Sequence, residues 1–178
     1  MLAQLWLPIL LTAVAMFFAS FLSWMIIQLH KQDWRKLPQE DAFLTALRGM
    51  NVPKGSYMFP NCNTPEEMRS PEFQQKHEQG PVGILTVFGK VNMGRNLGLQ
   101  FVFFLALSFC LAYLGTLGLN SGDDFMKVFR FMSTASLLAY LPAIVPHAIW
   151  FHCRITGHVI ESIAYALITG AIFGAMWP

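Results

Sequence analysis

The sequence predicts an all-α membrane protein with four transmembrane helices and a water-facing insert between the first and the second of them. Two observations carry this prediction. Hydrophobic residues make up 54% of the 178 residues and charged residues only 12%, whereas a soluble domain has about 25% charged residues. The apolar residues also gather in four runs, each close to the roughly 20 residues that cross a hydrocarbon layer of ~30 Å.

The four runs are too long for strands and lack the alternation of a half-buried strand. We therefore expect spanning helices at about residues 5–29, 97–119, 125–150 and 157–177. The first two carry no charged side chain, the third carries Lys127 and Arg130, and the fourth carries Glu161. Pro142 and Pro146 remove backbone hydrogen bonds from the third run, so we expect a kink there.

The distribution of Lys and Arg around the helix ends predicts the orientation in the membrane. Basic side chains flank the insert on both sides: Lys31, Arg35, Lys36, Lys90 and Arg95. By contrast, no basic side chain precedes Trp6, and the connection between the second and third helices, residues 120–124, is acidic. We expect residues 31–96 in the cytoplasm and both termini outside it.

The insert, residues 31–96, contains helix and strand signals despite its many charged residues. Thr64 and Glu67 have the spacing of a capping box, and Ser70 followed by Pro71 predicts a second helix start. A further short helix is expected after Pro38, and residues 55–59 and 82–88 have the composition of a two-stranded ribbon. This segment has too little apolar area for a large core, so we expect it to lie along the membrane surface or against a partner.

Small residues recur every fourth position in the last predicted helix. They are Ser162, Ala166, Gly170 and Gly174. Such a ridge allows close approach of helix backbones in lipid. Two interpretations follow: the ridge packs inside this four-helix bundle, or it docks the helix against another subunit or a second copy.

Four stretches resemble a family of small, uncharacterised bacterial integral membrane proteins. They read "HKQDWRKLPQED", "GSYMFPNC", "RSPEFQQKHEQGPVGILTVFGK" and "ESIAYALITGAIFGAMWP". The resemblance spans nearly the whole chain. It implies a location in the bacterial inner membrane and no activity, cofactor or residue role.

Polar residues gather in "PHAIWFHCRITGHVIE", residues 146–161, between the third and fourth helices. His158 and Glu161 are three residues apart and share a helix face, and His30, at the end of the first helix, reaches the same membrane level. Imidazole and carboxylate groups bind zinc, iron or copper, and axial histidines hold haem. The alternative interpretation is a structural turn at headgroup depth, because the spacing matches no established metal signature.

No catalytic motif stands out elsewhere in the chain. The stretch 83–91 differs from a phosphate loop in its glycine spacing and in the Val91 at its end. Cys62 and His77 lack a third residue that would orient them as a nucleophile and base. The net charge of +2 is small and scattered, which argues against nucleic acid as a partner.

We therefore expect a non-catalytic accessory or assembly subunit of a larger bacterial membrane complex, with the lipid bilayer as its surroundings. Two alternatives stay open. One is a small oligomeric transporter or channel. The other is a membrane metal- or haem-binding enzyme with its site at His158, Glu161 and His30, of which Glu161 carries most weight because an acid within a membrane span is a functional hypothesis by default.

Overall fold

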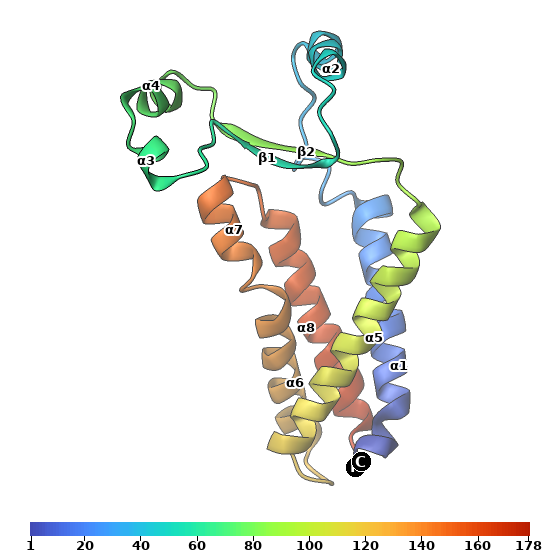
Figure 1. The fold of residues 1–178 in the computed structure, drawn as a ribbon. Coiled ribbons are helices and arrows are strands. Elements are labelled where there is room, and N and C mark those ends of the chain that lie inside the picture. The colour runs from blue at the N-terminus through green and yellow to red at the C-terminus, as the bar shows by residue number, and fades with distance from the viewer. The chain divides into compact units, whose positions relative to one another are not determined.

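The computed structural model describes residues 1–178 as two compact units, Met1–Arg35 together with Met93–Pro178, and Lys36–Asn92. The chain is mostly helical, and four helices of the first unit are long and apolar enough to cross a membrane (Figure 1). They are Leu2–Ile27, Met93–Gly118, Phe125–Phe151 and Thr156–Met176. The four predicted helices are confirmed, with boundaries shifted by a few residues.

The first span contains three kinds of helix. A 3-10 turn, η1 (Leu2–Leu5), leads into α1 (Trp6–Phe21), which continues as a π-helical segment, η2 (Leu22–Ile27). Gln28 then takes a left-handed conformation with φ of 55°. The N–H of Leu29 donates to the Ser23 carbonyl, so the chain turns sharply at this end of the span instead of continuing as a helix.

The third span is divided where the sequence predicts a kink. It consists of α6 (Phe125–Tyr140) and α7 (Ile144–Phe151), and Pro142 lies in the break because it has no N–H to donate to the preceding turn. Pro146 is the third residue of α7, where the N–H of any residue would lack an intrahelical partner. The kink is therefore a break at Pro142, and Pro146 is accommodated at a helix start.

The remaining spans are α5 (Met93–Gly118) and α8 (Thr156–Met176). In the bundle, α1 contacts α5 and α8, and α6 packs along α8. Two buried apolar clusters form the core. One comprises Leu5, Ile9, Leu111, Ala112, Leu119, Val128, Met132 and Phe173, and the other Ala13, Met16, Phe104 and Tyr165.

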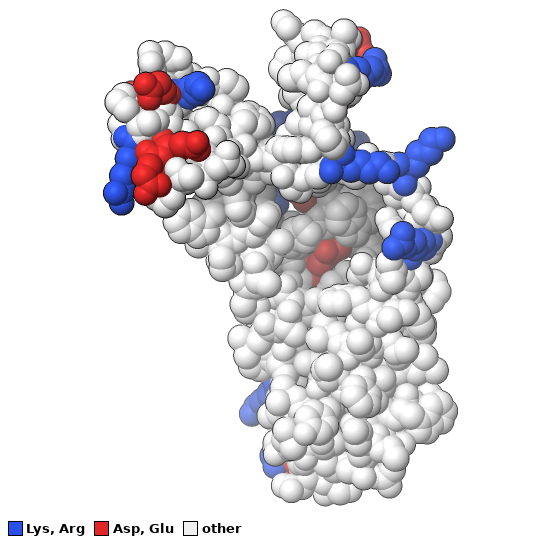
Figure 2. Space-filling view, viewed as in Figure 1, with Lys and Arg blue, Asp and Glu red and all other residues white.

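Most of each span faces outward. Only 17% to 39% of the positions in the four spans are buried, and the exposed positions are largely apolar, as Trp6 and Phe18 illustrate. On the face drawn in Figure 2 the surface of the long helices is almost free of charged groups. An outward apolar surface of this extent is suited to lipid rather than to water.

The predicted ridge of small residues lies inside the bundle. Ser162 and Ala166 are buried. A Cβ added at Gly170 would collide with Ser133 and Phe129 of α6, and one added at Gly174 would come within 2.9 Å of the Phe125 ring. The two glycines therefore allow α8 and α6 to approach closely, and an additional role of this helix in association stays a prediction.

The second unit consists of α2 (Glu40–Gly49), β1 (Gly55–Phe59), α3 (Pro65–Met68), α4 (Pro71–Gln79) and β2 (Gly83–Val87). The two strands pair in antiparallel register, with Gly55 opposite Val87 and Phe59 opposite Gly83. The predicted ribbon is confirmed.

The helix starts expected in this unit are also confirmed. Thr64 Oγ1 accepts from the N–H of Glu67, whose carboxylate accepts from Asn63 N–H. Ser70 Oγ accepts from the N–H of Phe73. These caps satisfy N–H groups that the first turn of a helix leaves unpaired.

No residue between Lys36 and Asn92 is buried. Large apolar side chains of this unit, among them Met50 and Phe88, are more than half exposed. The unit is therefore held by its backbone hydrogen bonds and caps and by partial side-chain contacts, as expected from its small apolar content.

Candidate functional site

His30 is brought into the bundle by the turn that ends the first span. The backbone N–H groups of Lys31 and Asp33 donate to the carbonyls of Gln28 and His30, which tightens residues 28–33 into a compact turn. As a result the His30 side chain is only 3% exposed. The Trp24 ring stacks on it with a centroid distance of 4.0 Å and an angle of 15° between the planes.

The other two residues lie in the first turns of α8. His158 and Glu161 are three residues apart, so both side chains project from one helix face. Glu161 is 7% exposed, whereas His158 retains partial exposure and lies at the edge of the site. Gly157 precedes them, and a Cβ at this position would lie 2.7 Å from His30 Cε1. A glycine is required here for α8 to begin so close to the His30 ring.

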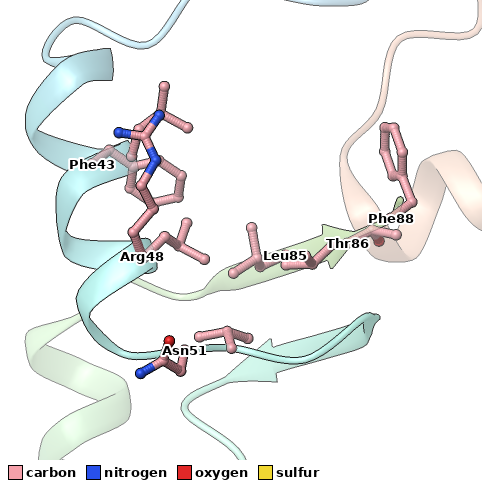
Figure 3. A pocket seen from close by; sticks show the side chains of 10 residues that line it. Phe43, Arg48, Asn51, Leu85, Thr86 and Phe88 are labelled. Carbon is pink, nitrogen blue, oxygen red and sulfur yellow. The ribbon is translucent and has the colours of Figure 1, made fainter. Parts of the chain in front are cut away.

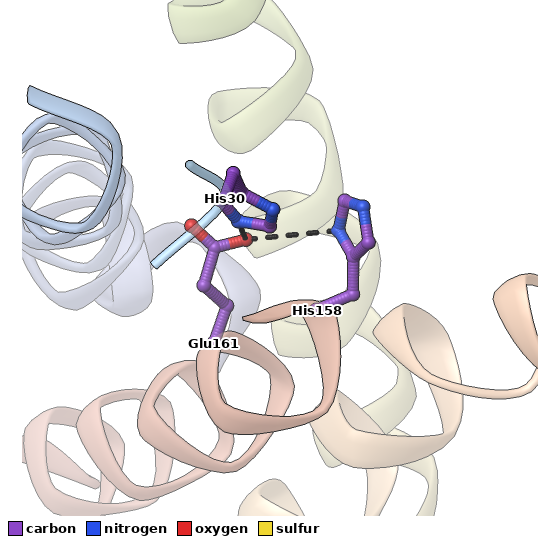
Figure 4. Close-up of side chains that lie close together, drawn as sticks. All are labelled: His30, His158 and Glu161. Carbon is purple, nitrogen blue, oxygen red and sulfur yellow. Dashed lines mark ion pairs between the residues drawn. The ribbon is translucent and has the colours of Figure 1, made fainter. Parts of the chain in front are cut away.

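The three side chains converge (Figure 4). His30 Nε2 lies 3.2 Å from Glu161 Oε2, and His158 Nδ1 lies 3.8 Å from the same oxygen. One ligand atom from each residue can be chosen so that all three lie within 4.8 Å of one another. Two ligands at 2.0–2.1 Å from a tetrahedral zinc ion are about 3.3 Å apart, so these separations are close to those of a metal site.

Asp33 determines which nitrogen of His30 faces Glu161. His30 Nδ1 and Asp33 Oδ2 are 2.7 Å apart, and a carboxylate can only accept, so Nδ1 carries the proton of this hydrogen bond. In neutral His30 the lone pair is then on Nε2, the atom that faces Glu161. Metal-binding histidines are oriented in this way by a carboxylate on the other ring nitrogen.

The contact between His30 and Glu161 is not a hydrogen bond. Nε2 lies 3.2 Å from Glu161 Oε2 and has no hydrogen-bond partner. In protonated His30 these two atoms form an ion pair. In neutral His30 with its proton on Nδ1 they are two acceptors, which repel, and leaving them unpaired is unfavourable. A cation bound between Nε2 and the carboxylate would remove the repulsion between these two acceptors and would give each of them a partner.

A single basic side chain borders the site. Arg154, in the connection between α7 and α8, places Nε 3.9 Å from Asp33 Oδ1, and its guanidinium donates to the Gln32 side chain. Arg154 is therefore directed to Asp33 and Gln32 and not to Glu161. The ion-pair partners of Glu161 are the two histidines, and no Lys or Arg is among them. The position between Glu161 and the two imidazoles therefore remains available to a cation.

The structure brings together the three residues that the sequence singled out, His30, His158 and Glu161, and separates them from the rest of the polar stretch. His147 packs on Phe151 within α7, and His152 and Cys153 are exposed in the following turn. In the second unit, Cys62 and His77 border the same groove without a hydrogen bond between them. None of these five residues takes part in the cluster.

Sequence reasoning missed Asp33, Trp24 and Gly157. Asp33 carried a usable signal, because it lies three residues after His30 in the turn. Trp24 and Gly157 carried none, since their contacts with His30 depend on the π-helical end of the first span and on how α8 packs beside it.

Comparison with protein-family models, with curated proteins and with solved structures finds no match to this chain.

Proposed function

We propose that the protein is a multi-pass membrane protein that binds a divalent transition-metal ion at His30, His158 and Glu161. The observation that supports it best is the pair His30 Nε2 and Glu161 Oε2, buried and 3.2 Å apart without a hydrogen bond, with Asp33 on the opposite ring nitrogen. A metal ion between two such acceptors accounts for their approach and for the orientation of the ring.

The ligand set narrows the choice of metal. Two imidazoles and one carboxylate suit zinc and iron(II), whereas calcium and magnesium prefer an all-oxygen set. Cys153 is exposed and outside the cluster, so a soft thiolate ligand for copper(I) is not supplied. Zinc is the simplest occupant, and iron(II) with the same ligand set is the alternative that the experiment below distinguishes.

Three protein ligands leave at least one coordination position for water or another small ligand, which is the arrangement of catalytic rather than structural zinc sites. His158 lies at the edge of the site and is partly exposed, so this position has a route to solvent. These features support a site that exchanges ligands. No particular reaction is assigned to it.

The cellular setting belongs to the same proposal. The basic side chains at residues 31–36 and 90–95 support a cytoplasmic location for the insert, and with it for the metal-binding end of the bundle. Residence in a bacterial inner membrane rests on the sequence resemblance. A role as an accessory or assembly subunit is compatible with a metal site, and co-purifying subunits would support it.

The experiment is metal analysis of the protein purified in mild detergent without chelators. We expect about one zinc or iron ion per chain, because the proposed site is a single set of three ligands. His158→Ala and Glu161→Gln should each lose the metal. His147→Ala, which removes a histidine of α7 outside the cluster, serves as the control and should retain the metal. Wild-type protein that stays metal-free after incubation with zinc and with iron(II) would overturn the proposal. Mass spectrometry of the same sample identifies any partner subunit.

A further inference from the structure

An apolar groove lies in the second unit between α2 and β2 (Figure 3). It has a volume of about 680 Å³, within the range of 300–1,000 Å³ that ligand sites occupy. Phe43 and Leu44 line it from α2, and Leu85, Val87 and Phe88 from the strand and its end. Phe43 and Leu44 are each 40% exposed and Phe88 is 73% exposed, so nothing within the chain fills the groove.

Cationic side chains border the groove. Arg48 is one of its lining residues and forms no ion pair. Lys54 extends over Gly89, directly after Phe88, so that a Cβ on Gly89 would lie 2.7 Å from Lys54 Nζ. Lys90 follows. Like Arg48, neither lysine has an acidic partner, because the ion pairs of the chain involve other basic side chains.

Four of the six acidic groups of this unit lie away from the groove-lining helix. Glu66, Glu67, Glu72 and Glu78 belong to α3 and α4, where Figure 2 shows acidic groups beside basic ones. The other two, Glu40 and Asp41, lie in the first turn of α2, whereas Arg48 lies in its last turn. The groove therefore combines an apolar floor with the cationic side chains of Arg48, Lys54 and Lys90, and no acidic residue lines it. This combination fits an amphiphile with an anionic head.

We propose that the groove docks on an anionic phospholipid of the bilayer, with the phosphate on Arg48 and the acyl region against Phe43, Leu44 and Phe88. Both ends of the unit continue into membrane-spanning helices, and residues 88–92 alone separate β2 from α5. Bilayer lipid is therefore the amphiphile that this unit is expected to meet, because the chain joins the unit to these helices. A basic segment next to a span attracts anionic headgroups, and an amphipathic helix such as α2 buries its apolar face in the headgroup region.

This inference is independent of the metal site, because it involves different residues in a separate unit of the chain. A bound lipid would cover apolar side chains that this unit leaves exposed.

The test uses the full-length protein in nanodiscs of phosphatidylcholine alone or with one third phosphatidylglycerol. Hydrogen–deuterium exchange is followed by mass spectrometry for peptides covering 40–52 and 83–90. We expect exchange of these peptides to slow several-fold when phosphatidylglycerol is present. Arg48→Gln should abolish the difference, and Arg48→Lys should retain part of it. Arg69→Gln, at the end of α3, is the matched control and should keep the full difference.

Equal exchange in the two lipids would overturn the proposal, whether the peptides are protected or not. Protection in both would show apolar contact without recognition of the anionic head, and protection in neither would leave the groove facing water. Protection that depends on a co-purifying protein would show a protein partner in place of lipid. Retention of the lipid-dependent difference in Arg48→Gln would equally contradict the assigned phosphate contact.

Discussion

At the scale of single residues, the geometry of the proposed site depends on side chains that are not among its three proposed ligands. Asp33 holds Nδ1 of His30 at 2.7 Å, Trp24 covers one face of the ring at 4.0 Å, and Gly157 leaves the space that the ring occupies. Together they fix the direction of Nε2. Replacing a residue that orients a metal ligand in this way typically lowers metal affinity by about 10–100-fold.

Asp33→Asn tests this orientation. The amide offers a donor as well as an acceptor, so the preference for a proton on Nδ1 is lost, and we expect zinc affinity to fall by about 10–100-fold. The measurement is competition against a zinc chelator, together with ¹⁵N NMR of the imidazole in the metal-free protein, where the fraction of the Nδ1–H tautomer should decrease.

The control for this substitution is Asp123→Asn. Asp123 pairs with Lys127 at 2.7 Å in the connection between α5 and α6 and is not part of the cluster, so its replacement should leave zinc affinity unchanged. An unchanged tautomer fraction in Asp33→Asn would show that Asp33 does not position His30.

Gly157→Ala tests the space beside His30. The added methyl group would lie 2.7 Å from Cε1 and 2.9 Å from Nδ1 of the ring, so the ring must move and its bond to Asp33 must lengthen. We expect zinc binding to weaken at least tenfold while the helical content stays the same, measured by chelator competition and circular dichroism. Gly98→Ala, where nothing lies within 4 Å of the added atom, should bind zinc as the wild type does.

At the scale of elements, departures from regular helix geometry build the site. The π-helical segment η2 and the left-handed Gln28 end the first span early and reverse the chain, which places His30 inside the bundle instead of at its surface. The break at Pro142 separates α7 from α6, while α8 continues unbroken and carries both His158 and Glu161. One proposed ligand therefore comes from a turn and two from one helix.

The packing of α8 on α6 is tested by Gly170→Ala. The methyl group would collide with the Ser133 hydroxyl and approach the backbone and ring of Phe129. Overpacking of a close interface costs about 1–3 kcal/mol, so we expect the free energy of unfolding in detergent to fall by that amount. Unfolding titrations monitored by circular dichroism measure it, and an unchanged midpoint would mean that the two helices are not in this close contact.

At the scale of the whole molecule, the four long helices and the short elements of the second unit could be predicted from the sequence. The candidate site could be predicted only in part. Long apolar runs predicted the spans because a bilayer demands about 20 apolar residues whatever the tertiary contacts. The caps at Thr64 and Ser70 and the ribbon were also predictable, because local residue chemistry determines them. The convergence of His158 and Glu161 follows from helix periodicity.

The contribution of the first span was harder to anticipate. An apolar run gives no sign of where an α-helix widens to a π-helix, and the predicted helix 5–29 therefore ended two residues beyond Ile27 and without the turn. His30 could be placed at the same end of the bundle as His158 and Glu161. Its stacking on Trp24, however, depends on the π-helical end of the first span, and its contact with Gly157 joins segments more than 120 residues apart in sequence. Such contacts leave no local pattern.

The most direct test of the central claim is X-ray absorption spectroscopy of the protein loaded with one equivalent of zinc. The proposed site predicts a first shell of nitrogen and oxygen at about 2.0–2.1 Å, with outer-shell scattering from two imidazoles that drops to one in His158→Ala. A shell containing sulfur at about 2.3 Å, or a spectrum without imidazole scattering, would contradict a site built from His30, His158 and Glu161.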